Sequence, residues 1–223
     1  MSFAFLYVSS FPKLDLIDDA LEFAKKLRKH TNLEVSFNIF NITSYADLEL
    51  DSVVDKVIDS SLEYVYMADT HGHLDLNRDM GKFEKHFKKI KKTGKKTGFH
   101  LHNHTGKAYM NYIKCKESLY VDLCDTSVMS LGKGAGNLKL EDVLSDEKSF
   151  LLNEFIFKHY DTVFKKTVSP YYLVTGRYGI TDNYATQAEK LKTPMHKFIN
   201  FCYGVSGLKI DNFDKNILKE FCG

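Results

Sequence analysis

Short apolar runs alternate with longer amphipathic stretches over the first two thirds of the chain. The runs are rich in aromatic and β-branched residues, which is typical of strands. The expected strands cover residues 3–9, 33–40, 64–69, 97–102 and 120–129. Apolar residues recur at helical spacing between them, and the expected helices cover about 14–27, 46–59, 83–90 and 106–118. Five successive strand–helix units predict a parallel sheet with right-handed crossovers.

Two architectures fit such a sheet: an open, doubly wound sheet and a (β/α)8 barrel of the TIM type. The chain has 223 residues, which is short for a closed barrel of about 250. Beyond residue 150 the pattern is helical and shows no clear sixth strand. In both architectures functional sites lie at the carboxyl ends of the strands. Polar residues gather at these ends, namely Asn38, Asn41, Asp69, His100, His102 and Asp125.

The composition is that of an ordinary globular protein. Hydrophobic residues make up 43% of the chain, which is enough for a single domain spanning residues 1–223. The net charge is +2, so we expect no nucleic-acid partner. No apolar run approaches the roughly 20 residues of a membrane span, so we expect no membrane partner. The four cysteines form no C-x-x-C pair and the first residues form no basic leader, which indicates a cytoplasmic protein with free thiols.

The stretch GFHLHNHTG at residues 98–106 carries the first candidate chemistry. His100 and His102 occupy alternate positions of an expected strand, so their side chains project to the same face. Two imidazoles from one strand end can bind one divalent metal ion. Spacing alone leaves open the alternative of a polar pair hydrogen-bonded among loop carbonyls. Downstream, GKGAGN at residues 132–137 precedes an expected helix, where N–H groups favour an anion, or else marks a tight turn.

These two motifs, with the Val-Asp pair at 121–122 between them, resemble the DRE-TIM metallolyases of the HMGL-like family. That family includes 4-hydroxy-2-oxovalerate aldolase, hydroxymethylglutaryl-CoA lyase and isopropylmalate synthase. Its pattern of G-F-H-x-H-N, a helix, a V-D strand and G-x-G-x-G-N is matched from Gly98 to Asn137. The sequence is most similar to aldolase-like proteins associated with bacterial surface-polysaccharide clusters. The resemblance covers residues 1 to about 150 and extends more weakly to YYLVTGRYGITDNYA at 171–185.

The resemblance implies an α/β fold of the TIM-barrel type, an incomplete barrel of about five parallel β-α units plus C-terminal helices. The units align with the last five of the family's eight, so the single aldolase-like domain is expected to be N-terminally truncated relative to the family. The family's first strand supplies a carboxylate and an arginine in a D-x-x-x-R-D-G-type stretch, and Asp69 or Asp125 is a candidate replacement for the carboxylate. An incomplete barrel leaves an edge strand, which a homodimer or a second chain would cover.

The resemblance also implies a divalent-metal-dependent aldolase or lyase that acts next to a 2-oxo acid through a pyruvate enolate. Mn²⁺ is favoured over Mg²⁺ because imidazole suits Mn²⁺ better. The implied metal ligands are His100, His102 and Asn137, and the implied substrate-binding residues are Asp69, Asn103, Lys133, Gly134 and Gly136. The chemistry also needs a catalytic base, and His71, His104 and His73 are candidates by their location. Tyr184 is a candidate catalytic donor, since it lies in a segment that resembles the family's last ordered loop. The expected partners are a small 2-oxo acid and an aldehyde.

Two alternatives to an aldolase remain open. An acyl-CoA condensing enzyme of the same family would form a carbon–carbon bond by related metal chemistry. A catalytically inactive barrel fragment would serve as a binding or assembly subunit. An R-D-G-type strand encoded upstream would favour an enzyme, and its absence would favour the inactive fragment.

Overall fold

The computed structural model describes residues 5–10, 15–31, 33–164, 169–206 and 213–222. The chain forms two compact units. Unit 1 comprises Met1–Thr70, Leu74–Leu101 and Met110–Asp125, and unit 2 comprises His71–His73, His102–Tyr109 and Thr126–Gly223. Residues 71–73 and 102–109 are thus part of unit 2, although the residues before and after each of these segments are part of unit 1.

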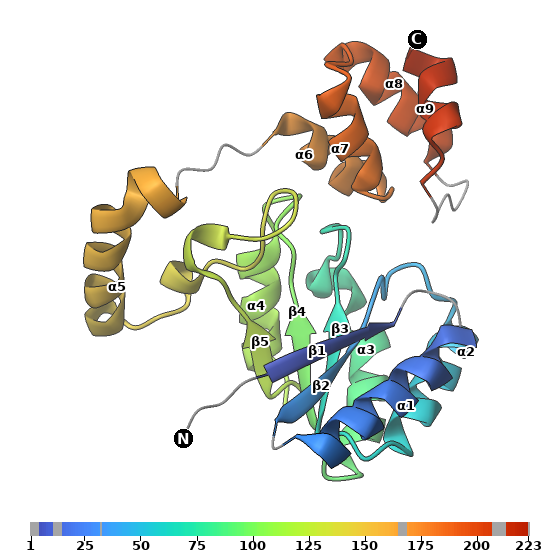
Figure 1. The fold of residues 1–223 in the computed structure, drawn as a ribbon, viewed down its shortest axis with the longest axis vertical. Coiled ribbons are helices and arrows are strands. Elements are labelled where there is room, and N and C mark those ends of the chain that lie inside the picture. The colour runs from blue at the N-terminus through green and yellow to red at the C-terminus, as the bar shows by residue number, and fades with distance from the viewer. Residues whose placement is uncertain (1–4, 11–14, 32, 165–168, 207–212, 223) are drawn as a thin grey trace. The chain divides into compact units, whose positions relative to one another are not determined.

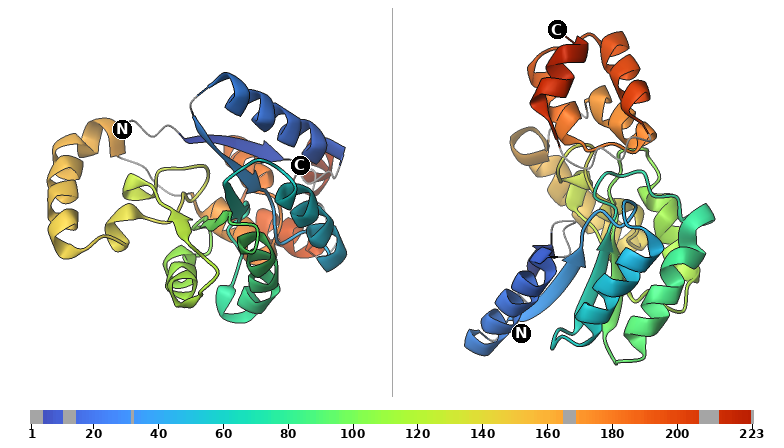
Figure 2. Two further views of the ribbon diagram at one scale, coloured as in Figure 1. Left: turned by 90° about the horizontal axis from the view of Figure 1, so that it is seen from below. Right: turned by 90° about the vertical axis from the view of Figure 1, so that its right-hand side faces the viewer.

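Unit 1 is an alternation of strands and helices. Its elements are β1 (Phe5–Ser10), α1 (Asp15–His30), β2 (Glu34–Ile39), α2 (Asp47–Ile58), β3 (Tyr64–Ala68), α3 (Leu76–Lys91), β4 (Lys96–His100), α4 (Ala108–Glu117) and β5 (Leu123–Asp125). The five strands are parallel and lie in the order β1-β2-β3-β4-β5 (Figure 1). The helices that connect successive strands lie on one face of the sheet (Figure 2), as right-handed crossovers between neighbouring parallel strands would place them. The predicted parallel sheet is confirmed.

Apolar side chains at the predicted spacing join the helices to the sheet. Phe83, Phe87 and Ile90 of α3 are one helical turn apart and all are buried. The ring of Phe99 in β4 meets the rings of Phe83 and Phe87 edge-on, with centroids 5.9 and 4.9 Å apart. Such edge-to-face pairs are favoured by the charge distribution of aromatic rings. This packing fixes β4, the strand that ends in His100.

Four of the expected strands, β2 to β5, are shorter in the structure than predicted. β4 ends at His100, so it does not extend to His102 as predicted. β5 is only three residues long, and the chain leaves the sheet after Asp125. In the segment that follows, Met129 and Ser130 take positive φ angles and Ser127 forms an isolated bridge with Lys139. Residues 3, 4 and 14 of the expected elements lie outside the described residues.

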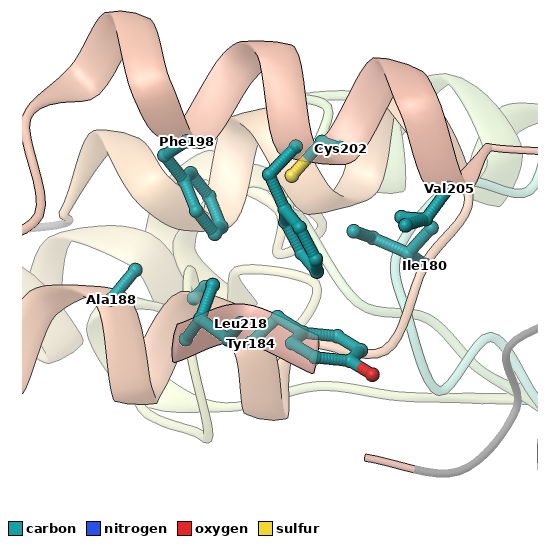
Figure 3. Close-up of a cluster of buried hydrophobic side chains, with 9 residues drawn as sticks. Ile180, Tyr184, Ala188, Phe198, Cys202, Val205 and Leu218 are labelled. Atoms are coloured by element: carbon teal, nitrogen blue, oxygen red, sulfur yellow. The ribbon is translucent and has the colours of Figure 1, made fainter. Parts of the chain in front are cut away.

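Unit 2 is helical, as predicted for the chain beyond residue 150. Its elements are the short helices η1 (Val128–Ser130), η2 (Leu140–Asp142) and η3 (Tyr160–Phe164) and the α-helices α5 (Asp146–His159), α6 (Pro170–Tyr178), α7 (Asn183–Lys190), α8 (Met195–Val205) and α9 (Lys215–Cys222). An apolar cluster lies between α7, α8 and α9, and Figure 3 shows its members Ile180, Tyr184, Ala188, Phe198, Cys202, Val205 and Leu218. In the described part of the chain, no helix is both long and apolar enough to span a membrane.

The α-helix expected directly after GKGAGN is not present. Asn137 is followed by the three-residue helix η2, and the next α-helix begins at Asp146. The chain instead returns toward residue 127, since the backbone N–H of Ser127 donates to the carbonyl of Leu138 at 2.9 Å. The expectation of an anion site at a helix N-terminus is therefore wrong, and the glycines need another explanation.

Candidate functional site

A buried carboxylate lies at the centre of a polar cluster in unit 2. The side chain of Asp182 is only 1% exposed, and its Oδ1 accepts a hydrogen bond from Nζ of Lys133 at 2.8 Å. Nδ1 of His71 lies 4.0 Å from the same oxygen, and Nε2 of His104 lies 3.8 Å from Oδ2. These four residues, called the Asp182 cluster below, come from four distant stretches of the chain. Three of them were predicted from sequence, and the structure brings the three together.

Glycines at two turns make room for His104. Gly72 and Gly134 both adopt positive φ angles, of +64° and +63°. A Cβ atom at either position would collide with the imidazole of His104. Both residues are therefore glycine for conformational and steric reasons together. Gly134 of the GKGAGN turn is therefore explained by its close packing against the buried His104. A tight turn of this kind was the alternative to an anion site.

The electrostatics of the Asp182 cluster favour a neutral histidine at position 71. Burial lowers the pKa of His71 to about 4, and the nearby Asp182 carboxylate only partly opposes the shift. His73, whose ring stacks on His71 with centroids 6.3 Å apart, and Lys133 lower that pKa further. Nδ1 of His71 has no hydrogen-bond partner among the described residues. At neutral pH the ring is therefore uncharged, and it takes up a proton only as the pH falls toward 4.

A second polar group lies at the carboxyl end of the sheet in unit 1. Nδ1 of His100 is 3.1 Å from Oδ2 of Asp125, its neighbour in the register of β4 and β5. Burial raises the pKa of the Tyr66 hydroxyl, and the Asp125 carboxylate, with which it is hydrogen-bonded, raises it further. A Cβ on Gly98 would lie 2.5 Å from the Tyr66 ring, so this glycine lets the tyrosine lie across β4. Asp125 thus accepts bonds from both a tyrosine and a histidine.

Other predicted residues have structural contacts. Asp69 is buried, and its carboxylate accepts the backbone N–H of Leu74 at 3.2 and 3.3 Å, which holds the turn after β3. Oδ1 of Asn103 accepts the backbone N–H of Ala108 at 3.2 Å, at the start of α4. Tyr184 is fully buried in the apolar cluster, and its hydroxyl accepts the N–H of Asp214 at 3.1 Å. The structure places Tyr184 in the core of unit 2, which does not favour the predicted contact with substrate.

The remaining predicted metal ligands follow the end of β4. His102 forms an isolated antiparallel bridge with Asn137, so a continuous strand does not set its orientation. Oδ1 of Asn137 is buried and has no hydrogen-bond partner in the part of the chain that the structure describes. Across the described ranges, no three His, Cys, Asp or Glu side chains are grouped so that they could hold one metal ion. The predicted set of two histidines and one amide therefore stays a prediction.

Asp182 was missed from sequence. It directly precedes α7, where an aspartate is usually taken as a helix cap. In the structure its side chain makes no capping bond to α7 and is paired with Lys133 instead. The only available signal was its position in the segment 171–185, whose resemblance to the family is weak.

Comparison with solved structures places the fold. The carboxyl transferase domain of pyruvate carboxylase from Rhizobium etli matches with a TM-score of 0.59 and 13% identity, over 91% of this chain and 37% of that chain. A variant of the whole Rhizobium etli enzyme, crystallised without acetyl coenzyme A, matches with a TM-score of 0.59 and 14% identity, over 92% and 22%. The N-terminal domain of a protein assigned as an aldolase from Bacteroides vulgatus matches with a TM-score of 0.48 and 22% identity, over 97% and 62%.

At these identities the similarity is one of fold alone. The chain spans 62% of the Bacteroides vulgatus chain and a smaller share of the two Rhizobium etli chains. The fold is α/β and of the TIM-barrel type, an incomplete barrel of five parallel β-α units followed by helices. Comparison with curated protein sequences gave no match.

The family is defined by sequence. The HMGL-like family profile matches residues 8–149, which is more than half of the chain. The chain therefore belongs to the HMGL-like family.

Proposed function

We propose that this protein is a divalent-metal-dependent lyase that cleaves or forms a carbon–carbon bond next to a 2-oxo acid, with pyruvate as one partner. Family membership supports the reaction class. The observation that carries the proposal is the contact between His100 and Asp125, because it prepares a motif histidine for metal binding. The proposal includes a cytoplasmic setting, for which the free thiols of Cys115, Cys124 and Cys202 are suitable. It also includes a role in surface-polysaccharide synthesis, which rests on the resemblance.

The residues fit a metal in their donor chemistry. The proposed ligands are His100, His102 and Asn137, assigned through the family motif. A metal-binding histidine usually donates its other ring N–H to a carboxylate, as Nδ1 of His100 is placed to do toward Asp125. The buried Oδ1 of Asn137 has no hydrogen-bond partner among the described residues, as expected for an oxygen that serves a ligand. When bound, the metal would act as a Lewis acid on the keto group of the substrate.

The Asp182 cluster would place polar groups beside the substrate in this proposal. His71 is uncharged at neutral pH, and a pKa of about 4 makes it a weak base, so it would serve as a neutral hydrogen-bonding group. The ammonium of Lys133 is the counter-charge of Asp182, and the exposed part of its side chain, 55%, is the part that would contact substrate. His104 is completely enclosed, so its role is to position its neighbours and not to touch substrate.

Asp125→Asn is expected to weaken Mn²⁺ binding by about 10–100-fold, because an amide orients His100 less well than a carboxylate does. Isothermal titration with Mn²⁺ measures the effect. Asp142→Asn, an exposed carboxylate beside Lys139, serves as the matched control and leaves the affinity unchanged. Equal affinities for wild type and Asp125→Asn would show that the His100–Asp125 contact has no part in metal binding.

The proposed reaction is tested by incubating the protein and Mn²⁺ with 4-hydroxy-2-oxo acids and measuring released pyruvate. We expect pyruvate from at least one acid, with loss of activity in His100→Ala and full activity in His196→Ala, an exposed histidine on α8. A parallel assay with acetyl-CoA and 2-oxo acids measures free thiol. Thiol release without pyruvate release would identify the condensing enzyme in place of the lyase.

The inactive alternative predicts a different outcome of the same assays. A folded protein that binds Mn²⁺ with His100 and still releases neither pyruvate nor thiol would support a barrel fragment that binds or assembles.

A further inference from the structure

Two cysteines of unit 1 are in contact between helix α4 and strand β5. Cys115 of α4 is only 2% exposed, whereas Cys124, the middle residue of β5, is partly exposed. A hydrogen bond joins their side chains. Both residues also line one surface hollow with a volume of about 170 Å³. Two thiols in contact, one of them reachable from solvent, are the arrangement from which a disulfide can form.

The strand register explains why Cys124 meets α4. Cys124 lies beside Phe99 of β4, so the two side chains point to the same face of the sheet. The ring of Phe99 packs against two rings of α3, which identifies this face as the one that the helices cover. Neighbouring residues of a strand alternate, so Asp125 points to the opposite face with His100. The cysteine pair is therefore separate from the contact between His100 and Asp125.

The two sulfur atoms differ in their access and in their protonation. The hydrogen bond with Cys124 raises the pKa of the Cys115 thiol, and burial raises it further. Cys115 is therefore protonated and enclosed, so a reagent from solvent does not reach it first. Cys124 is reached through the hollow, which is large enough for a small peroxide. Any oxidation of the pair should therefore begin at Cys124 and end at Cys115.

We propose that Cys115 and Cys124 form a reversible disulfide when the protein reacts with a hydroperoxide such as hydrogen peroxide. The sulfur of Cys124 first attacks one peroxide oxygen. An S–O bond forms, the O–O bond breaks, and the departing hydroxide leaves as water with the thiol proton of Cys124. The sulfur of Cys115 then attacks that of Cys124, so that the S–S bond forms and the S–O bond breaks.

The second step releases the hydroxyl group as water, together with the thiol proton of Cys115. Over both steps the two thiols lose two electrons and two protons, and one hydrogen peroxide molecule becomes two water molecules. No metal ion and no 2-oxo acid takes part. The inference is therefore independent of the proposed lyase reaction.

The position of β5 in the sheet suits such a bond. The sulfur atoms must approach to about 2.05 Å, which requires a small movement of the backbone or the side chains. β5 is three residues long and lies last in the strand order, next to β4. A short strand at the edge of a sheet moves at a lower cost than a central strand. Because Cys124 is partly exposed, we expect glutathione to reduce the disulfide.

Peptide mass spectrometry of the full chain after treatment with hydrogen peroxide tests the proposal. Wild type is expected to give a linked pair of peptides that contain Cys115 and Cys124, and reduced glutathione is expected to separate them. In Cys115→Ala the reaction should stop at the sulfenic acid of Cys124, which dimedone labels. In Cys124→Ala we expect Cys115 to be labelled at least about tenfold less, because it is enclosed.

Two other cysteines provide controls. Cys202 is fully buried in the apolar cluster of unit 2 and should stay reduced in wild type. Cys222→Ser removes a cysteine of α9 and should form the same link as wild type. Circular dichroism verifies that each protein is folded before treatment.

Four results would overturn the proposal. The first is folded wild type without the link at a peroxide concentration that oxidises free cysteine. The second is a link from Cys124 to Cys222 in place of Cys115. The third is equal dimedone labelling of Cys115 in Cys124→Ala and of Cys124 in Cys115→Ala. The fourth is a link that glutathione does not reduce.

Discussion

Lys133→Met is expected to lower the free energy of unfolding by about 3 kcal/mol, because it leaves a buried carboxylate without its counter-charge. Asp182 is 1% exposed and its Oδ1 receives a hydrogen bond from Lys133. Methionine keeps the length and apolar surface of the lysine stem, so the loss of stability measures the effect of removing the charge. His71 and His104 lie near the carboxylate, but both approach it at 3.8–4.0 Å and neither replaces the ammonium. Urea unfolding at pH 7 measures the change.

Asp182→Asn is the matched comparison, and its expected cost is only about 1 kcal/mol. The two partners of the pair differ in exposure, since 55% of the Lys133 side chain faces solvent. Without the carboxylate, the ammonium can therefore be hydrated by water. Equal losses in the two variants would contradict this account, because they would mean that the carboxylate is not buried in solution.

The stability of wild type is expected to fall by about 3 kcal/mol more than that of His71→Gln between pH 7 and pH 4. Burial lowers the pKa of His71 to about 4 in the folded protein, whereas a histidine in the unfolded chain has a pKa near 6.5. Between these values the unfolded chain binds a proton that the folded protein does not bind. The contribution of neutral His71 to the free energy of unfolding is therefore complete above pH 6.5 and is lost as the pH falls toward 4.

Urea titrations at several pH values measure this difference between wild type and His71→Gln. His196→Gln, in which an exposed histidine of α8 is replaced, is the control and should follow wild type at every pH. A difference that does not change with pH would show that His71 is protonated in the folded state as easily as in the unfolded state. In that case burial would not hold His71 in the neutral form.

The fold could be predicted because its pattern is local. Apolar runs and helical spacing predicted five parallel strands, but they left open whether the strands form a doubly wound sheet or a barrel, and therefore their order. The strand ends were predicted less well, because the apolar run of residues 120–129 continues beyond the paired residues. β5 ends at Asp125, and the following segment contains positive φ angles at Met129 and Ser130 that their side chains do not indicate.

The candidate site was predicted only in part. His71 and His104 were selected by their location and Lys133 with the GKGAGN motif, and the structure gathers them around one carboxylate. Asp182 was missed because it is more than 40 positions from Lys133 and reads as an ordinary helix cap. Tyr184 was selected from the same segment, but its neighbours Phe201 and Phe213 make it part of the apolar core. Whether a side chain joins the polar cluster or the apolar core depends on long-range packing, which a single sequence does not reveal.

The central claim is that the chain supports metal-dependent enolisation of a 2-oxo acid. The most direct measurement is deuterium uptake into the methyl group of pyruvate, followed by mass spectrometry in D₂O with added Mn²⁺. This account predicts uptake by wild type that is lost in His100→Ala and His102→Ala and kept in His196→Ala. No uptake by folded, metal-saturated wild type would contradict the account and favour a binding or assembly role.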